Sequence, residues 1–144
     1  STPRATIKLS WSKKPTFVNP VLVVNSPTQG RMEIPTANVD TWSNFPFAYT
    51  QQIDLWGMIP SKFAIKQLVD GEYTFNAIFA GSLENRPVNE VMPYVVLEID
   101  GIVHEIHAPV TTLIDNARWE AFKIIVRNGN YTIEKPNSWE DFSG

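Results

Sequence analysis

Apolar and polar residues alternate along most of the chain with the period of two that is typical of β-strands. The clearest runs are Ala5 to Trp11, Glu72 to Phe79 and Tyr94 to His107. Each run has one apolar face, and such a face must be buried against a second layer. The pattern predicts an all-β protein, an antiparallel β-sandwich of immunoglobulin-like or jelly-roll-like type, with about eight to ten short strands; a barrel is the alternative.

Asp100 and Gly101 separate two alternating runs, and this dipeptide favours a two-residue type I′ turn in which both residues have positive φ. With this turn Leu97 faces His104, and we expect His104 to be largely buried against Leu97 and Ile106. The other residues of the same face are apolar: Val95, Ile99 and Ile102. Asn128 and Gly129 give a second signal of the same kind.

The length of 144 residues fits a single domain. We expect the β-sandwich to span residues 1–135 and residues 136–144 to form a polar C-terminal tail. Helical spacing occurs in one interval only, and it predicts at most one short helix near 112–119, with Leu113, Ile114 and Ala117 facing inward.

The net charge is −3, only 19% of residues are charged, and no run of like charge occurs. Nucleic acid and anionic membranes call for a clustered basic surface, so neither is an expected partner. No apolar run reaches the roughly 20 residues of a membrane span, so membrane insertion is not expected either. A protein or glycan partner fits this composition better.

The motifs of common enzyme classes are missing from the sequence. The chain has no cysteine, no Gly-x-Ser-x-Gly elbow and no glycine-rich phosphate loop, and it has two histidines. We therefore expect neither catalysis nor a cofactor. His104 and His107 are spaced as a metal-binding pair on a helix would be, but on a strand they point to opposite faces.

A candidate metal site lies on the opposite face of the predicted hairpin, where Glu98, Glu105 and His107 share one side. Three nitrogen and oxygen ligands suit zinc or another divalent ion. Solvated charges on an outer sheet face are the simpler interpretation of the same residues.

Two tryptophans are candidates for ligand binding, because a flat ring can stack on the apolar face of a sugar. Trp42 lies in a polar loop, and Trp56 lies on the polar side of the run from Phe45 to Leu55, opposite Tyr49. The alternative is that each ring covers an edge of the core. Trp11 and Trp119 are assigned to the core by the patterns around them.

The run Asn19-Pro-Val-Leu-Val-Val-Asn-Ser-Pro-Thr-Gln-Gly30, followed by Asp70-Gly-Glu-Tyr-Thr-Phe-Asn-Ala-Ile-Phe79, resembles bacterial secreted β-sandwiches of the prepeptidase C-terminal type. This resemblance implies a non-catalytic accessory or adhesion module that is extracellular, periplasmic or at the cell surface. Those domains typically carry an acidic D-x-D-L run, whereas Asn19 and Val21 stand at the acidic positions here. The calcium role implied by the family is therefore not expected in this chain.

Chelator treatment should leave the melting temperature unchanged, because the acidic pair is missing and the core is large enough to fold without metal. Thermal unfolding with and without EDTA measures this. A melting temperature that falls with chelator and recovers with calcium or zinc would show that a bound metal stabilises the folded state.

Overall fold

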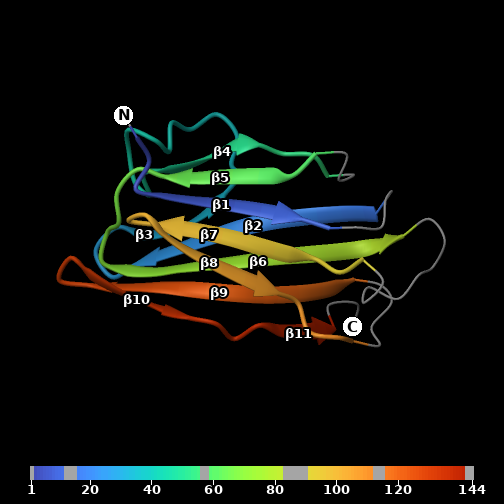
Figure 1. Cartoon of the computed structure of the whole chain (residues 1–144). Coiled ribbons are helices and arrows are strands. Elements are labelled where there is room, and N and C mark those ends of the chain that lie inside the picture. Colours follow the sequence, from blue (N-terminus) through green and yellow to red (C-terminus); the bar gives the residue numbers. More distant parts are fainter. Residues whose placement is uncertain (1, 12–15, 56–58, 83–90, 112–115, 142–144) are drawn as a thin grey trace.

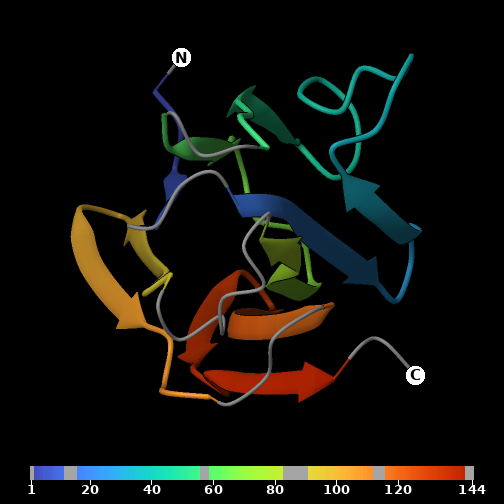
Figure 2. The ribbon, with the colours of Figure 1, turned by 90° about the vertical axis from the view of Figure 1, so that its right-hand side faces the viewer.

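The computed structural model describes residues 2–11, 16–55, 59–82, 91–111 and 116–141 (Figure 1). These residues form eleven strands and no helix, in two antiparallel sheets that pack face to face (Figure 2). The sheets are not closed into a barrel, so the predicted β-sandwich is confirmed. The described residues contain no helix long and apolar enough to cross a membrane.

Sheet A contains β4 (Ala48–Gln52), β5 (Ser61–Ile65), β1 (Ala5–Ser10), β7 (Tyr94–Ile99) and β8 (Ile102–His107), in that spatial order. Sheet B contains β10 (Asn130–Glu134), β9 (Ala117–Arg127), β6 (Gly71–Ser82), β2 (Thr16–Ser26) and β3 (Gly30–Ile34). The last strand, β11 (Ser138–Asp141), pairs with the first part of β9, while β10 pairs with its second part. In sheet A, β8 comes last in the strand order and pairs with β7 on one side only, so it is an edge strand.

The core is organised around β6, whose alternating side chains are fully buried: Tyr73, Phe75, Ala77 and Phe79. Phe75 contacts Phe63 of the opposite sheet edge-to-face, with ring centroids 5.4 Å apart, and stacks on Phe122 of its own sheet at 5.6 Å. Aromatic pairs in these geometries stabilise a core beyond the area that they bury. The predicted apolar face of this strand is confirmed.

A register shift between β6 and β9 keeps both halves of β9 facing the same core although the alternation of its sequence changes phase. Phe75 pairs with Phe122, but the next residue, Asn76, pairs with Glu120, so Ala121 is the extra residue of a bulge. Ala121 and Phe122 are both fully buried although they are neighbours. Odd-numbered residues point inward before the bulge and even-numbered residues after it.

The helix expected near 112–119 is wrong over its last three residues, and residues 112–115 lie outside the described part of the chain. Ala117 and Trp119 are buried and Arg118 between them is not, which is the period of a strand. Pairing with β6 on one side and β11 on the other outweighs the weak helical spacing. Within the segment expected as a polar C-terminal tail, 136–144, residues Ser138–Asp141 form the short strand β11.

The sidedness that the sequence predicts around β4 is also wrong. Ala48 is fully buried, whereas Tyr49 is 37% exposed and points outward. Phe47, just before the strand, has a positive φ of 59°, which interrupts the two-residue alternation and reverses the faces. Tyr49 therefore belongs to the surface and not to the core.

Raising the pH above 10 should destabilise the fold through Tyr73. Its buried hydroxyl accepts a hydrogen bond from the Val69 N–H at 2.8 Å, and burial raises its pKa from 10.0 to about 12. The unfolded chain then loses this proton first, so about 2–3 kcal/mol of unfolding free energy should disappear as pH rises from the unfolded to the folded pKa. Urea unfolding between pH ~8 and ~11.5 measures this slope.

Tyr73→Phe provides the control, because it removes the ionising group and keeps the ring. At neutral pH it should cost about 1 kcal/mol, since the Val69 N–H loses its acceptor. The alkaline slope should become shallower; a slope equal to that of the parent protein would contradict this role for Tyr73.

Candidate functional site

The hairpin of β7 and β8 has the predicted turn. Asp100 and Gly101 have φ angles of 50° and 79°, and the register places Leu97 opposite His104. The expected burial is only partly correct: Ile106 is buried, His104 is half-buried, and Ile102 is 56% exposed. As the edge strand of its sheet, β8 has an inner face that is covered at one end and open near the turn.

The turn is fixed to the start of β1 by Arg4. The Arg4 guanidinium donates to both carboxylate oxygens of Asp100, at 3.0 and 3.2 Å, and lies over the ring of Tyr131 at 5.8 Å. The hydrogen bond from Arg4 lowers the pKa of Asp100, and the Asp100 N–H donates to the Arg4 carbonyl at 3.2 Å. These contacts hold the hairpin against both sheets, so Asp100 has a structural role.

The candidate metal ligands are only partly brought together. His107 Nε2 lies 2.6 Å from Glu105 Oε1, and the His107 ring stacks on Tyr94 with centroids 5.2 Å apart. Glu98 is exposed on the same face, opposite Val103. Among the described residues, no three histidine or acidic side chains form a group that could hold a metal ion. Glu105 and His107 satisfy each other instead.

A hollow of ≈ 270 Å³ lies beside His107 at the end of the hairpin, and its lining is largely apolar: Met92, Pro93, His107, Ala108, Pro109 and Val110. Met92 is 60% exposed and Val110 86% exposed. Side chains of this size are seldom left so open without a partner when several lie together.

One wall of this hollow is fixed by residues that the sequence assigned to a tail. Asn137 accepts a hydrogen bond from Trp119 Nε1 at 2.8 Å and donates to the His107 carbonyl at 2.9 Å. Trp139 donates from Nε1 to the Pro109 carbonyl at 2.8 Å. In Figure 2 the segment that follows β8 runs beside β11. The available sequence signal was Trp139, a large ring in an otherwise polar segment.

Trp42, the first of the two aromatic candidates, lies against Tyr49 and not in isolation. The two rings meet edge-to-face with centroids 4.8 Å apart, and Lys66 Nζ lies 5.9 Å from the centre of the Trp42 ring. The Asp40 carboxylate accepts hydrogen bonds from the N–H groups of Ser43 and Trp42, which lower its pKa and fix the loop. Trp56 lies outside the described residues.

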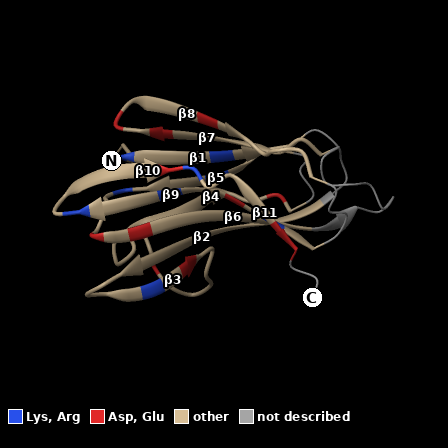
Figure 3. Cartoon of the chain, turned by 90° about the horizontal axis from the view of Figure 1, so that it is seen from below, with Lys and Arg blue, Asp and Glu red and all other residues tan. Residues whose placement is uncertain are grey.

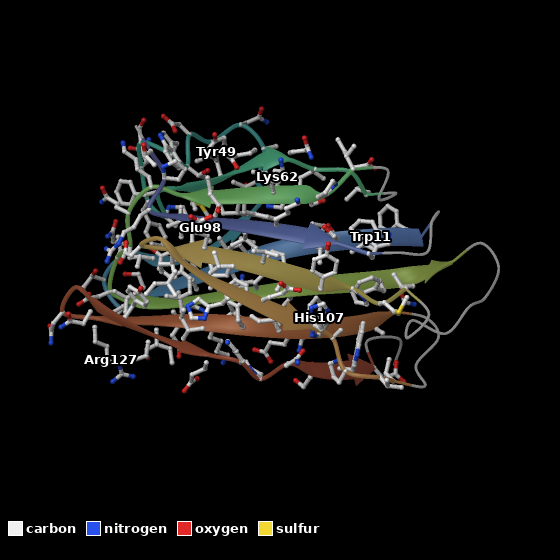
Figure 4. The ribbon with its side chains drawn as sticks, in the orientation of Figure 1. Trp11, Tyr49, Lys62, Glu98, His107 and Arg127 are labelled. Atoms are coloured by element: carbon white, nitrogen blue, oxygen red, sulfur yellow. The ribbon has the colours of Figure 1, made fainter. Side chains whose placement is uncertain are left out.

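The outer faces of the two sheets differ in chemistry. Outer-face ion pairs of sheet B join neighbouring side chains: Arg31 with Glu33, Arg118 with Glu140, and Lys123 with Glu120. Among the described residues, the large hydrophobic side chains that are exposed on a strand all lie on sheet A: Tyr49, Ile102 and Val103. Ile59 lies between β4 and β5 of the same sheet, and the others lie on connections between the two sheets: Val39, Met92 and Val110. Figure 4 labels Tyr49, Lys62, Glu98 and His107 across the outer face of sheet A.

Charge does not distinguish the two faces. Figure 3 shows acidic and basic positions interspersed over both sheets. Sheet B also has a shallow hollow of ≈ 300 Å³ on its outer face, but its charged lining residues are the ones paired above. Sheet A is therefore the side with unsatisfied apolar surface.

Replacing Asn137 with Ala should cost about 1–3 kcal/mol of unfolding free energy, because it leaves the buried Trp119 N–H without its acceptor. Asn137 has a positive φ of 47°, which Ala tolerates poorly, so Asn137→Gly is the matched control: it also loses both side-chain bonds but relieves that backbone strain. Chemical denaturation of both variants separates the two effects. A Gly variant as stable as the parent protein would mean that the bonds to Trp119 and His107 contribute nothing.

Comparison of the chain with family models, with curated proteins and with solved structures gave no match. The resemblance to prepeptidase C-terminal domains therefore stays a prediction.

Proposed function

We propose that this domain is a non-catalytic binding or structural module of a secreted or surface protein, and that it engages a protein partner through the sheet A side. The observation that carries the proposal is that, among the described strands, large exposed apolar side chains occur on sheet A and not on sheet B. These side chains lie at both edges of sheet A, around Tyr49 and around Val103, and exposed apolar patches mark protein interaction sites.

Two further arguments come from the residues. The sequence supplies no thiol and no nucleophile elbow, and His107 is hydrogen-bonded to Glu105, so the non-catalytic interpretation fits the available side chains. The secreted or surface location rests on the prepeptidase C-terminal resemblance alone.

A carbohydrate-binding module is the alternative, and the contact between Trp42 and Tyr49 favours it. Two adjoining aromatic rings at the surface can stack on a sugar. However, Lys66 lies over the Trp42 ring and would have to move before a sugar could occupy that face. Apolar exposure elsewhere on sheet A is not explained by this alternative.

The test applies the labelled domain to printed arrays of glycans and of purified extracellular proteins. Binding to protein spots should fall at least about tenfold, or 1.4 kcal/mol, in the double variant Tyr49→Lys/Val103→Lys. The matched control is Arg31→Ala/Glu33→Ala on sheet B, which removes an exposed ion pair and should retain binding. Equal loss in both variants, or no protein binding, would contradict the proposal.

The same arrays test the alternative. Glycan binding that disappears in Trp42→Ala, together with a tryptophan-fluorescence change on titration with the bound glycan, would support a sugar site in place of a protein site.

A further inference from the structure

The open edge of β8 has free backbone groups at defined positions. In a two-residue hairpin the residues flanking the turn form a hydrogen-bonded pair, and such pairs then alternate with non-hydrogen-bonded ones. Ile99 and Ile102 are the first bonded pair, so Val103, Glu105 and His107 direct their N–H and C=O groups away from β7. The bond from the Ala108 N–H to the Pro93 carbonyl, 3.0 Å, confirms this alternation at the far end.

One of these outward groups is occupied, since the His107 carbonyl accepts the hydrogen bond from Asn137 Nδ2. The backbone groups of Val103 and Glu105 have no hydrogen-bond partner among the described residues. Asn137 thus closes one end of the edge and leaves the rest available for pairing.

Natural edge strands usually prevent such pairing with lysine, proline or a bulge. β3 carries the ion pair of Arg31 and Glu33, and β4 has a register shift between Thr50 and Gln52. β8 has no lysine, no proline and no bulge, and its one ion pair, Glu105 with His107, lies at the end far from the turn. Near the turn it exposes Ile102 by 56% and Val103 by 60%, one on each face, so this part of the edge is open to pairing.

The charges around this edge decide what fits it. The hairpin from Tyr94 to His107 contains three acidic residues, Glu98, Asp100 and Glu105, and no lysine or arginine. Arg4 pairs with Asp100 and His107 with Glu105, whereas Glu98 is exposed without an ion pair to any described residue. A residue of an added strand opposite Val103 would have Glu105 as a diagonal neighbour and Glu98 two strands away, on the far side of Val103. A long basic side chain, which can reach across Val103, is therefore favoured there.

A second copy of this chain does not fit. Symmetric antiparallel pairing of β8 with itself, using the groups of Val103 and Glu105, aligns Glu105 either with Val103, whose neighbour is Glu98, or with its own counterpart. The second register places the two Glu105 carboxylates directly opposite each other, and the first makes them diagonal neighbours, so like charges meet in both.

We propose that β8 adds one extended segment of a partner protein as a further strand of sheet A, with lysine or arginine on the outer face and apolar residues covering Ile102 and His104. Main-chain hydrogen bonds to Val103 and Glu105 give affinity, and the alternating side chains give specificity. This inference rests on the proposed binding role and deepens it by naming the edge and the chemistry of the partner.

The probe is an acetylated and amidated peptide in which lysine and valine alternate over seven residues, starting and ending with valine. Fluorescence anisotropy of labelled peptide should show saturable binding, and NMR hydrogen exchange of the Val103 and Glu105 amides should slow at least about tenfold at saturation. A peptide with glutamate in place of each lysine is the charge control and should bind at least about tenfold more weakly.

Backbone methylation separates strand addition from simple charge attraction. In antiparallel addition the lysines of the peptide lie opposite Val103 and Glu105 and exchange backbone hydrogen bonds with them, so N-methylation of the lysines should abolish binding. N-methylation of the valines blocks only the far edge of the added strand and should leave binding to β8 intact. Equal binding by both methylated peptides, or unchanged exchange at Val103 and Glu105, would overturn the proposal.

Variants of the protein provide a second line. Val103→Pro removes an N–H that does not pair with β7, so the hairpin should survive while peptide binding is lost. Val103→Thr keeps the N–H and is the matched control. In the parent protein without peptide, the hydrogen exchange of the Val103 and Glu105 amides should not depend on protein concentration. Exchange that slows as the protein concentration rises would identify a second copy as the occupant and refute a basic partner.

The protein array distinguishes this inference from the function on which it rests. If Val103→Pro still binds the array partner that Tyr49→Lys/Val103→Lys loses, the partner binds the sheet A side but does not add a strand to β8. That result refutes the strand-addition inference and leaves the proposed function standing. If neither the parent protein nor any variant binds a protein spot, the proposed function fails first.

Discussion

The structure depends on burying the inner face of β6. Four alternating positions of this strand, from Tyr73 to Phe79, are fully buried, and the strand pairs with β2 on one side and β9 on the other. Because a sheet presents its side chains alternately to two faces, an apolar face this large requires a second sheet above it. Sheet A supplies that cover through groups such as Phe63, and the bulge at Ala121 keeps β9 facing the same core after its phase changes.

A two-layer sandwich leaves four outer edges, and the molecule treats them differently. Near β11, Asn137 and Trp139 use side-chain hydrogen bonds to hold the segment that leaves β8, which closes the sandwich at one end of the hairpin. Beyond that point no described group pairs with the outward backbone of Val103 and Glu105. The same strand is therefore anchored at its end and free along its length, the arrangement that strand addition needs.

The two outer faces of the sandwich differ in the kind of side chain that they expose. On sheet B, charged residues find partners on their own or adjacent strands, so that face is satisfied in water. On sheet A, exposed apolar groups gather at both edges of the sheet, around Tyr49 and around Val103. Net charge and overall composition average over this difference, which is why only the arrangement of the strands reveals which sheet exposes apolar side chains.

Local sequence patterns determined most of the secondary structure. The period of two predicted most of the strands and their inward faces, with β4 and the start of β9 as exceptions. Asp100-Gly101 and Asn128-Gly129 form turns with positive φ at all four residues, because such conformations depend on neighbours in the chain. Whether a face is covered depends on strand order, which is not local. The alternation correctly put Ile102 on the inner face of β8, yet it is exposed because β8 lies at an edge. The positive φ of Phe47 reversed the two faces of β4, so that Tyr49 contacts Trp42 at the surface. Asn137, in the segment expected as a tail, is held by hydrogen bonds to Trp119 and His107, which are distant in the sequence.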